Sequence, residues 1–292
     1  MPANYELKKW ARAALKDNWQ NALMVALIAS LPSLVAQVMN ILAGADLSLI
    51  MSDIAANTTA STVDELLAVY VQAFQMYFGA WHVRLVELIA FLITPMLTLG
   101  LLHYLQQLLR GEKDLGICMA FSRIGLFWKG IGLELMQGLR IFGWSLLGML
   151  AMTAGFVAAL LLPEELAAVG SALIIGGCVV FMVLVIRAAF SYAMIKMVMA
   201  DKPASGVNEC FRISRAMMDY YRARLFSLEL SFILFHLGIM VLYSLLLGMV
   251  GYVVAITVQM VLSFVLNVYI QTTVSGFYLA RREEMRKMTE QA

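Results

Sequence analysis

The chain has 292 residues, of which 62% are hydrophobic and 14% are charged, and its formal net charge is +2. Soluble domains usually carry about a quarter charged residues. A soluble fold of this length could not hide so much apolar surface, because a large share of any folded chain stays in contact with water. The composition therefore excludes an ordinary soluble domain and indicates a protein that a lipid bilayer solvates.

Six apolar runs are long enough to cross a bilayer, which takes about 20 helical residues. They cover residues 20–42, 85–109, 133–162, 166–190, 225–249 and 252–280. The fourth run stays apolar to residue 199, so we expect its last turns to extend beyond the hydrocarbon on the cytoplasmic side. The sequence thus predicts an all-α, polytopic membrane helical bundle, with residues 1–292 forming a single membrane domain.

The connections between the runs differ in length and charge. The connection 44–84 is long and polar, and residues 64–77 suit a short helix on the membrane surface. The connections at residues 163–165 and 248–251 are short, so they predict helical hairpins. Lysine and arginine lie almost entirely at the termini and in segments 110–129 and 196–224. Because positive residues favour the cytoplasmic side of a membrane, we expect both termini to be cytoplasmic.

A basic amphipathic segment precedes the first, third and fifth runs. Hydrophobic residues follow helical spacing in segments 7–15, 114–129 and 203–224. We interpret each segment as an interfacial helix that introduces a hairpin, so that one unit occurs three times. Their cations could bind anionic lipid headgroups on the cytoplasmic face, or could serve only as positive-inside anchors. These cations are Lys8, Lys9, Arg12, Lys16, Arg123, Lys129, Arg212, Arg215, Arg222 and Arg224.

Three parts of the sequence resemble a bacterial membrane family catalogued as domain of unknown function 975. The letters LKDNW at residues 15–19, after AR at 11–12, are similar to the opening of that family. SRAMM at 214–218 with FSLELSF at 226–232, and GFY at 276–278, are similar to later blocks. The resemblance implies a multi-span protein of the bacterial cytoplasmic (inner) membrane. It implies no catalytic residues, because no activity is established for the family.

Soluble-enzyme motifs are missing from the sequence. It contains no P-loop, no H-E-x-x-H and no G-x-S-x-G. The three cysteines are far apart and form no C-x-x-C pair, and the three histidines are isolated. We therefore predict that the protein is not an enzyme, and we expect no cofactor, no metal site and no nucleic-acid partner.

Polar residues form stripes at helical spacing within the first, fifth and sixth runs. A polar group without a partner in hydrocarbon costs several kcal/mol, so these stripes either line a hydrated cavity or join packed helices. The candidate cavity residues are Gln37, Asn40, Glu229, His236, Gln259, Ser263, Asn267 and Gln271. We also expect a buried ion pair between Arg187 and Glu229, which both lie near the inner ends of their runs.

Two functions fit these patterns. The leading hypothesis is a non-enzymatic membrane protein that binds lipid, a peptide or a protein partner through its basic segments. The alternative is a small-solute transporter or channel with a polar pathway between spans one, five and six. Small residues at spacing four, such as Ala151, Gly155 and Ala159, could serve internal packing or a homo-oligomer, and the sequence does not decide between them.

Overall fold

The computed structural model describes residues 1–43, 68, 71, 74–112, 115–161 and 167–291. These residues contain helices and no strand, which confirms the predicted all-α class. The elements are α1 (Asn4–Leu15), α2 (Trp19–Leu42), α5 (Trp81–Leu109), η1 (Ile117–Phe121), η2 (Ile124–Leu126), α6 (Phe127–Leu161), α7 (Ala167–Ser191), α8 (Ile195–Asp201), α9 (Val207–Met218), α10 (Arg222–Leu230), α11 (Ile233–Val250) and α12 (Tyr252–Gln291).

Six helical segments are long and apolar enough to cross a membrane. They are Trp19–Leu42, Trp81–Leu109, Ile117–Ala158, Ala172–Asp201, Arg222–Val250 and Val254–Met288. The predicted polytopic architecture is therefore confirmed, with differences of several residues at some bounds. The predicted turn at 163–165 and most of the predicted surface helix at 64–77 lie outside the described residues.

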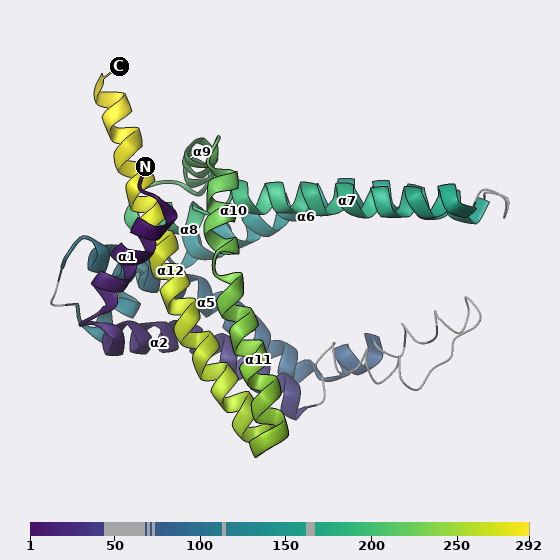
Figure 1. The fold of residues 1–292 in the computed structure, drawn as a ribbon, viewed down its shortest axis with the longest axis horizontal. Helices are drawn as coiled ribbons and strands as arrows, with labels where there is room; N and C mark the ends of the chain where they lie inside the picture. The colour runs from purple at the N-terminus through teal and green to yellow at the C-terminus, as the bar shows by residue number, and fades with distance from the viewer. Residues whose placement is uncertain (44–67, 69–70, 72–73, 113–114, 162–166, 292) are drawn as a thin grey trace.

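The spans pair into hairpins that meet at one end of the molecule (Figure 1). Gly251 alone joins α11 to α12, and its φ of 90° lies in the left-handed region that glycine adopts without strain. Glycines also let α6 and α7 touch. A Cβ atom at Gly148 would lie 2.6 Å from the Cα of Phe181, and one at Gly155 would lie 2.7 Å from the carbonyl oxygen of Leu173. Gly155, part of the small-residue stripe, therefore serves packing inside this hairpin.

The two hairpins run in different directions: in Figure 1 the α6–α7 hairpin extends to the right and the α11–α12 hairpin extends downward. Apolar side chains stay exposed along both of them, for example Leu150, Val183 and Leu245. In water such surfaces would be unfavourable, whereas lipid tails are as apolar as the side chains themselves. The exposed faces of both hairpins therefore suit contact with a bilayer.

The buried core lies where the hairpins meet. Leu7 of α1, Phe211 of α9, Leu228 of α10 and Phe277 of α12 are all almost fully buried there. Helix α8 also lies in this core, because its residues 197–200 are buried together with Ile195. The fourth run is therefore not one continuous helix up to residue 199, and the position of its last turns relative to the membrane stays a prediction. The chain turns at residues 192–194, and the apolar extension packs into the core.

The three interfacial segments take different forms. The first is the expected amphipathic helix α1, which buries Leu7, Ala11 and Leu15. The second is two short 3-10 turns, η1 and η2, in place of a single helix over residues 114–129. Its backbone lies directly on α5, because a Cβ atom at Gly100 would be 2.0 Å from the carbonyl oxygen of Ala120.

The third segment is helical but shorter than predicted. Helix α9 ends at Met218, and Tyr220 adopts a φ of 62°, which breaks the predicted helix over residues 203–224. Helix α10 then starts at Arg222, so this turn brings a new helix N-terminus beside the end of α9. A second turn at residues 231–232 separates α10 from α11 within span five.

Candidate anionic-ligand site

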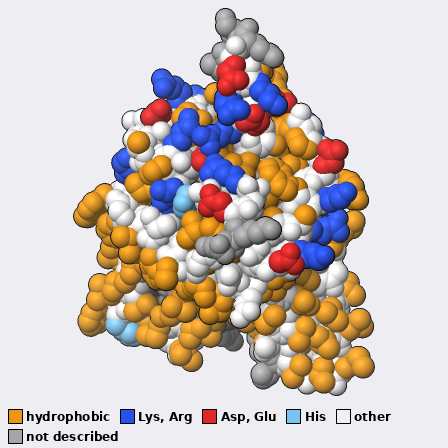
Figure 2. Space-filling model, turned by 90° about the vertical axis from the view of Figure 1, so that its left-hand side faces the viewer, with side chains coloured by type: hydrophobic (Ala, Val, Ile, Leu, Met, Phe, Trp, Pro, Cys, Tyr) orange, Lys and Arg blue, Asp and Glu red, His pale blue; other side chains and the backbone are white. Residues whose placement is uncertain are grey.

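Lysine and arginine side chains gather at the end of the molecule where the hairpins meet, and hydrophobic side chains cover the opposite end (Figure 2). This separation matches the charge asymmetry of the sequence. The predicted lipid-surface cations divide into those that hold the fold together and those that remain available to a ligand.

Several predicted lipid-surface cations bind the protein itself. The Lys8 ammonium lies 4.2 Å from the centre of the Phe232 ring and donates to the backbone oxygen of Ser231. Burial, together with the nearby charge of Arg12, lowers the pKa of Lys8. These contacts turn Lys8 toward the protein and away from a lipid headgroup.

Three further cations of the predicted surface also join elements. Arg123 contacts His103 at 3.0 Å, and Lys129 donates to the Pro203 carbonyl at 2.8 Å. Arg224 donates to the backbone oxygens of residues 1 and 2. By contrast, Lys9 and Arg12 of α1 and Lys16, which follows the end of α1, are exposed.

The arginine cluster, as we name it, lies at the base of the α6–α7 hairpin. It combines three residues of the predicted surface with Arg140 and with Arg187, which we expected to pair with Glu229. Its members are Arg140 of α6, Arg187 of α7, Arg212 and Arg215 of α9, and Arg222 at the start of α10. The turn at Tyr220 makes this grouping possible, because it carries the chain from α9 into α10 beside α7.

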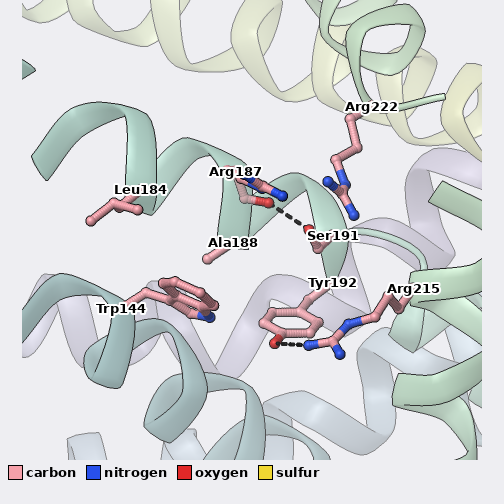
Figure 3. A pocket seen from close by; sticks show the side chains of 8 residues that line it. All are labelled: Trp144, Leu184, Arg187, Ala188, Ser191, Tyr192, Arg215 and Arg222. Atoms are coloured by element: carbon pink, nitrogen blue, oxygen red, sulfur yellow. Dashed lines mark hydrogen bonds between the residues drawn. The ribbon is translucent and has the colours of Figure 1, made fainter. Parts of the chain in front are cut away.

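The inner pocket is a cavity of about 290 Å³ within this cluster. Arg187, Arg215 and Arg222 line it from three different helices, and the guanidinium groups of Arg187 and Arg222 point into the same space (Figure 3). Arg215 donates to the hydroxyl of Tyr192 at 3.3 Å. The remaining wall is mostly apolar and consists of Trp144, Leu184 and Ala188, with Ser191 beside them.

A short network fixes α9 against the end of α7. The Ser214 hydroxyl donates to the backbone oxygen of Ser191 at 3.1 Å, and the Ser191 hydroxyl donates to the backbone oxygen of Arg187 at 2.6 Å. The rings of Tyr192 and Phe211 meet edge to face, with 5.3 Å between their centres. These contacts are largely buried, so they hold the pocket arginines on a rigid base.

The outer pocket, a cavity of about 470 Å³, adjoins the inner one. Arg215 and Arg222 line both pockets. Arg140 and Arg212 line only the outer pocket, together with Asn208, Phe211, Ala216 and Asp219. The Arg140 guanidinium stacks on the Phe211 ring, with its central carbon 4.0 Å from the ring centre.

The cluster carries far more positive than negative charge. Among the ion pairs of the described residues, its only carboxylate partner is Asp219, which lies 3.8 Å from Arg222 and is 61% exposed. The Nε atom of Arg222 is buried without a hydrogen-bond partner in the described part of the chain. Guanidinium groups match phosphate geometry with two parallel hydrogen bonds, so this arrangement suits a phosphate-bearing anion.

The expected ion pair between Arg187 and Glu229 is wrong. Arg187 shares the inner pocket with Arg222, and the described ion pairs do not include Glu229. Glu229 lies seven residues beyond Arg222 on α10, which is about 10 Å along a helix axis. Glu134, which lies in the letters LEL at residues 133–135 as Glu229 does at 228–230, pairs with Lys196 at 2.6 Å.

The polar stripe of span one faces span two. Asn40 donates to Glu87 and accepts from Arg84, both at 2.5 Å, and Arg84 also pairs with Glu87. Gln37 and Asn40 line a cavity between α2, α5 and the start of α6, which includes Glu134. This cavity therefore places Gln37 and Asn40 beside spans two and three, whereas the predicted cavity lay between spans one, five and six.

The other polar stripes make local contacts. Gln271 donates to Asn267 one helical turn away at 2.9 Å, and His236 contacts the backbone oxygen of Phe232 at 3.2 Å. Gln259 and Ser263 are half-buried on α12. The described contacts therefore do not join the stripes of spans one, five and six.

Sequence reasoning missed a buried carboxylate at the end of α8. The Asp201 side chain is 4% exposed, and it binds Arg110 at 2.6 Å, the Tyr278 hydroxyl at 2.8 Å and Arg282. It thus ties α8 to α5 and α12. The available signal was a lone acid at the end of a long apolar run, since a buried charge requires partners.

Comparison with known proteins places this architecture in a family. A family model described as "Protein of unknown function (DUF975)" matches residues 1–284. The chain belongs to the DUF975 family. This confirms the resemblance carried by the three short motifs, and the match includes the whole arginine cluster. No curated protein and no solved structure matches this DUF975 chain.

Proposed function

We propose that this DUF975 protein binds anionic phospholipid through the arginine cluster and catalyses no reaction. The proposal places it in a bacterial inner membrane, with the cluster and both termini on the cytoplasmic side. The observation that carries it is the convergence of Arg187, Arg215 and Arg222 on one pocket, where the ion pairs of the described residues include one acid, the exposed Asp219.

The wall of the inner pocket favours lipid over a soluble anion or a peptide. Trp144 and Leu184 line the pocket on the side of the hairpin, and the neighbouring α7 residues Val180 and Val183 are exposed and apolar. A lipid could place its phosphate on the guanidinium groups and its acyl chains along α7. Each cation near a membrane surface contributes about 1 kcal/mol to such binding.

The transport alternative receives less support from the geometry. Its pathway required the polar stripes of spans one, five and six to share a cavity. Asn40 instead bonds with Glu87 of span two, while Asn267 bonds with Gln271 of its own helix. Polar contacts of this kind are the ordinary way in which membrane helices satisfy their polar groups.

The test compares phosphatidylglycerol with phosphatidylcholine of the same acyl chains, added to the full-length protein in detergent after delipidation. We expect phosphatidylglycerol to bind more tightly by native mass spectrometry. The double variant R215Q/R222Q removes two charges, so its affinity for phosphatidylglycerol should fall by roughly tenfold to thirtyfold.

The matched control is the double variant R286Q/K287Q, which removes two exposed cations on α12 that line neither pocket of the arginine cluster. It should bind phosphatidylglycerol like the unmodified protein. Equal affinity for the two lipids, or equal loss in both double variants, would contradict the proposal. Size-exclusion profiles and helical circular dichroism establish that each variant is folded.

A further inference from the structure

The two pockets of the arginine cluster form one continuous basic surface. Arg215 and Arg222 line both cavities, which hold about 290 Å³ and about 470 Å³. Arg187 belongs to the inner pocket alone. Arg140 and Arg212 belong to the outer pocket alone. Each pocket therefore has at least one arginine that the other lacks, and the two pockets share Arg215 and Arg222.

This distribution exceeds what one phosphate group requires. A phosphodiester carries one negative charge, whereas five arginines with one exposed acid, Asp219, surround the joined pockets. Helix α9 places Arg212 and Arg215 three residues apart on one face, so they lie side by side. The small side chain of Ala216 lines the outer pocket next to them.

Arg140 and Arg222 both have N–H groups without an acceptor among the described residues. The Arg140 guanidinium lies over the Phe211 ring, and among the described residues its hydrogen-bond acceptor is Asn208, so four of its five N–H donors have no acceptor there. The buried Nε of Arg222 lacks an acceptor among the described residues. Arg140 lines the outer pocket and Arg222 lines both, so each pocket contains an arginine with N–H donors available to a ligand.

We propose that the joined pockets bind one lipid with two phosphodiester groups, as in cardiolipin, with one phosphate in each pocket. This inference rests on the proposed function and names the lipid class. Two phosphates joined by a glycerol can enter separate pockets. The adjacent phosphates of a lipid diphosphate share an oxygen and suit a single pocket. The acyl chains then follow the apolar wall of Trp144 and Leu184.

The experiment titrates the full-length, delipidated protein in detergent with cardiolipin, with phosphatidylglycerol at equal phosphate, and with a polyprenyl diphosphate. Native mass spectrometry measures the affinity and stoichiometry of each complex. We expect one cardiolipin per protein and an affinity about tenfold or more above that for phosphatidylglycerol. Cardiolipin carries both phosphates, so binding of the first holds the second near its own pocket.

Single variants test the two pockets separately. R187Q changes only the inner pocket, R212Q changes only the outer pocket, and R286Q is the matched control on the exposed face of α12. Each pocket variant should lower the affinity for cardiolipin by about fivefold or more, given the contribution of a cation at a membrane surface. The control should leave it unchanged.

Three results would overturn the inference. These are equal binding of cardiolipin and phosphatidylglycerol at equal phosphate, a preference for the diphosphate, or loss of cardiolipin affinity in only one of the two pocket variants. In each case the proposed function survives if phosphatidylglycerol binding still depends on Arg215 and Arg222. If no anionic lipid binds the unmodified protein, both proposals fail together.

Discussion

The charge of Asp201 is balanced by its neighbours, whereas the positive charge of the arginine cluster is not. Asp201 is buried and has three partners, which satisfy its carboxylate from different helices. The cluster lies at the surface, and in the described part of the chain its arginines form an ion pair with one acid, Asp219. A fully partnered charge stabilises a fold, whereas a surplus of one sign attracts a ligand of the other. Asp201 is therefore tested by measuring stability, and the arginine cluster by measuring ligand binding.

Replacing Asp201 with Asn should destabilise the protein without changing lipid binding. The substitution removes the countercharge of Arg110 and Arg282 and weakens the bond to Tyr278. Breaking a buried ion pair costs about 3–5 kcal/mol, and we expect about 2–3 kcal/mol here because both arginines are partly exposed. Unfolding by sodium dodecyl sulfate, followed by circular dichroism, measures the difference.

The control for this prediction is Glu290→Gln, which removes an exposed acid that pairs with Arg286 across one helical turn. Such a pair contributes about 0.3–0.5 kcal/mol, so the control should unfold like the unmodified protein. If Asp201→Asn unfolds at the same detergent concentration as Glu290→Gln, then Asp201 has no special part in stability.

Residue types and spacing in the sequence identify candidate cations for the site. They do not show which of these cations line the pockets. Arg215 and Arg222 belong to a recognisable basic segment, and both line the pockets. Lys8 and Lys129 belong to similar segments, yet they bind backbone oxygens of the protein. Helical spacing places a side chain on a face but does not say which face meets another helix.

At the scale of single helices, glycine decides how closely two spans pack. A Cβ atom at Gly177 would lie 2.7 Å from the Cα of Met152, whereas one at the neighbouring Gly176 would meet no atom within 4 Å. Replacing Gly177 with Ala should therefore force α6 and α7 apart at a cost of about 1–3 kcal/mol. Thermal unfolding in detergent is the measurement.

Gly176→Ala provides the adjacent control. It adds the same methyl group to open space on the same helix, where alanine favours the helical state by about 1 kcal/mol relative to glycine. This variant should be as stable as the unmodified protein or slightly more stable. Similar losses in both variants would show that helix propensity, and not the close contact, governs the hairpin.

The helices themselves could be predicted from hydropathy, but their breaks could not. The apolar run from 166 to 199 gives no sign that α7 ends at Ser191 and that α8 turns into the core. The sequence around the turn at Tyr220 likewise contains no glycine or proline that would have predicted it. Tertiary packing sets these breaks, because each one lets a buried side chain reach the shared core.

For the whole molecule, the separation of charge predicts its orientation. We expect the cluster-bearing end and the C-terminus in the cytoplasm, because lysine and arginine gather there. A C-terminal green fluorescent protein fusion expressed in bacteria should fluoresce, and a C-terminal alkaline phosphatase fusion should be inactive. Active phosphatase with a dark fluorescent fusion would reverse the proposed orientation.

The position of the core has a consequence for biosynthesis. The core unites Leu7 of α1, Val198 of α8 and Tyr278 of α12, which are synthesised at the beginning, late middle and end of translation. Each hairpin can enter the membrane as it leaves the ribosome, because its own two helices cover each other. The core can close only after α12 has been made. Until then, α1 and α8 lack part of their final packing, so folding ends with a step that follows insertion.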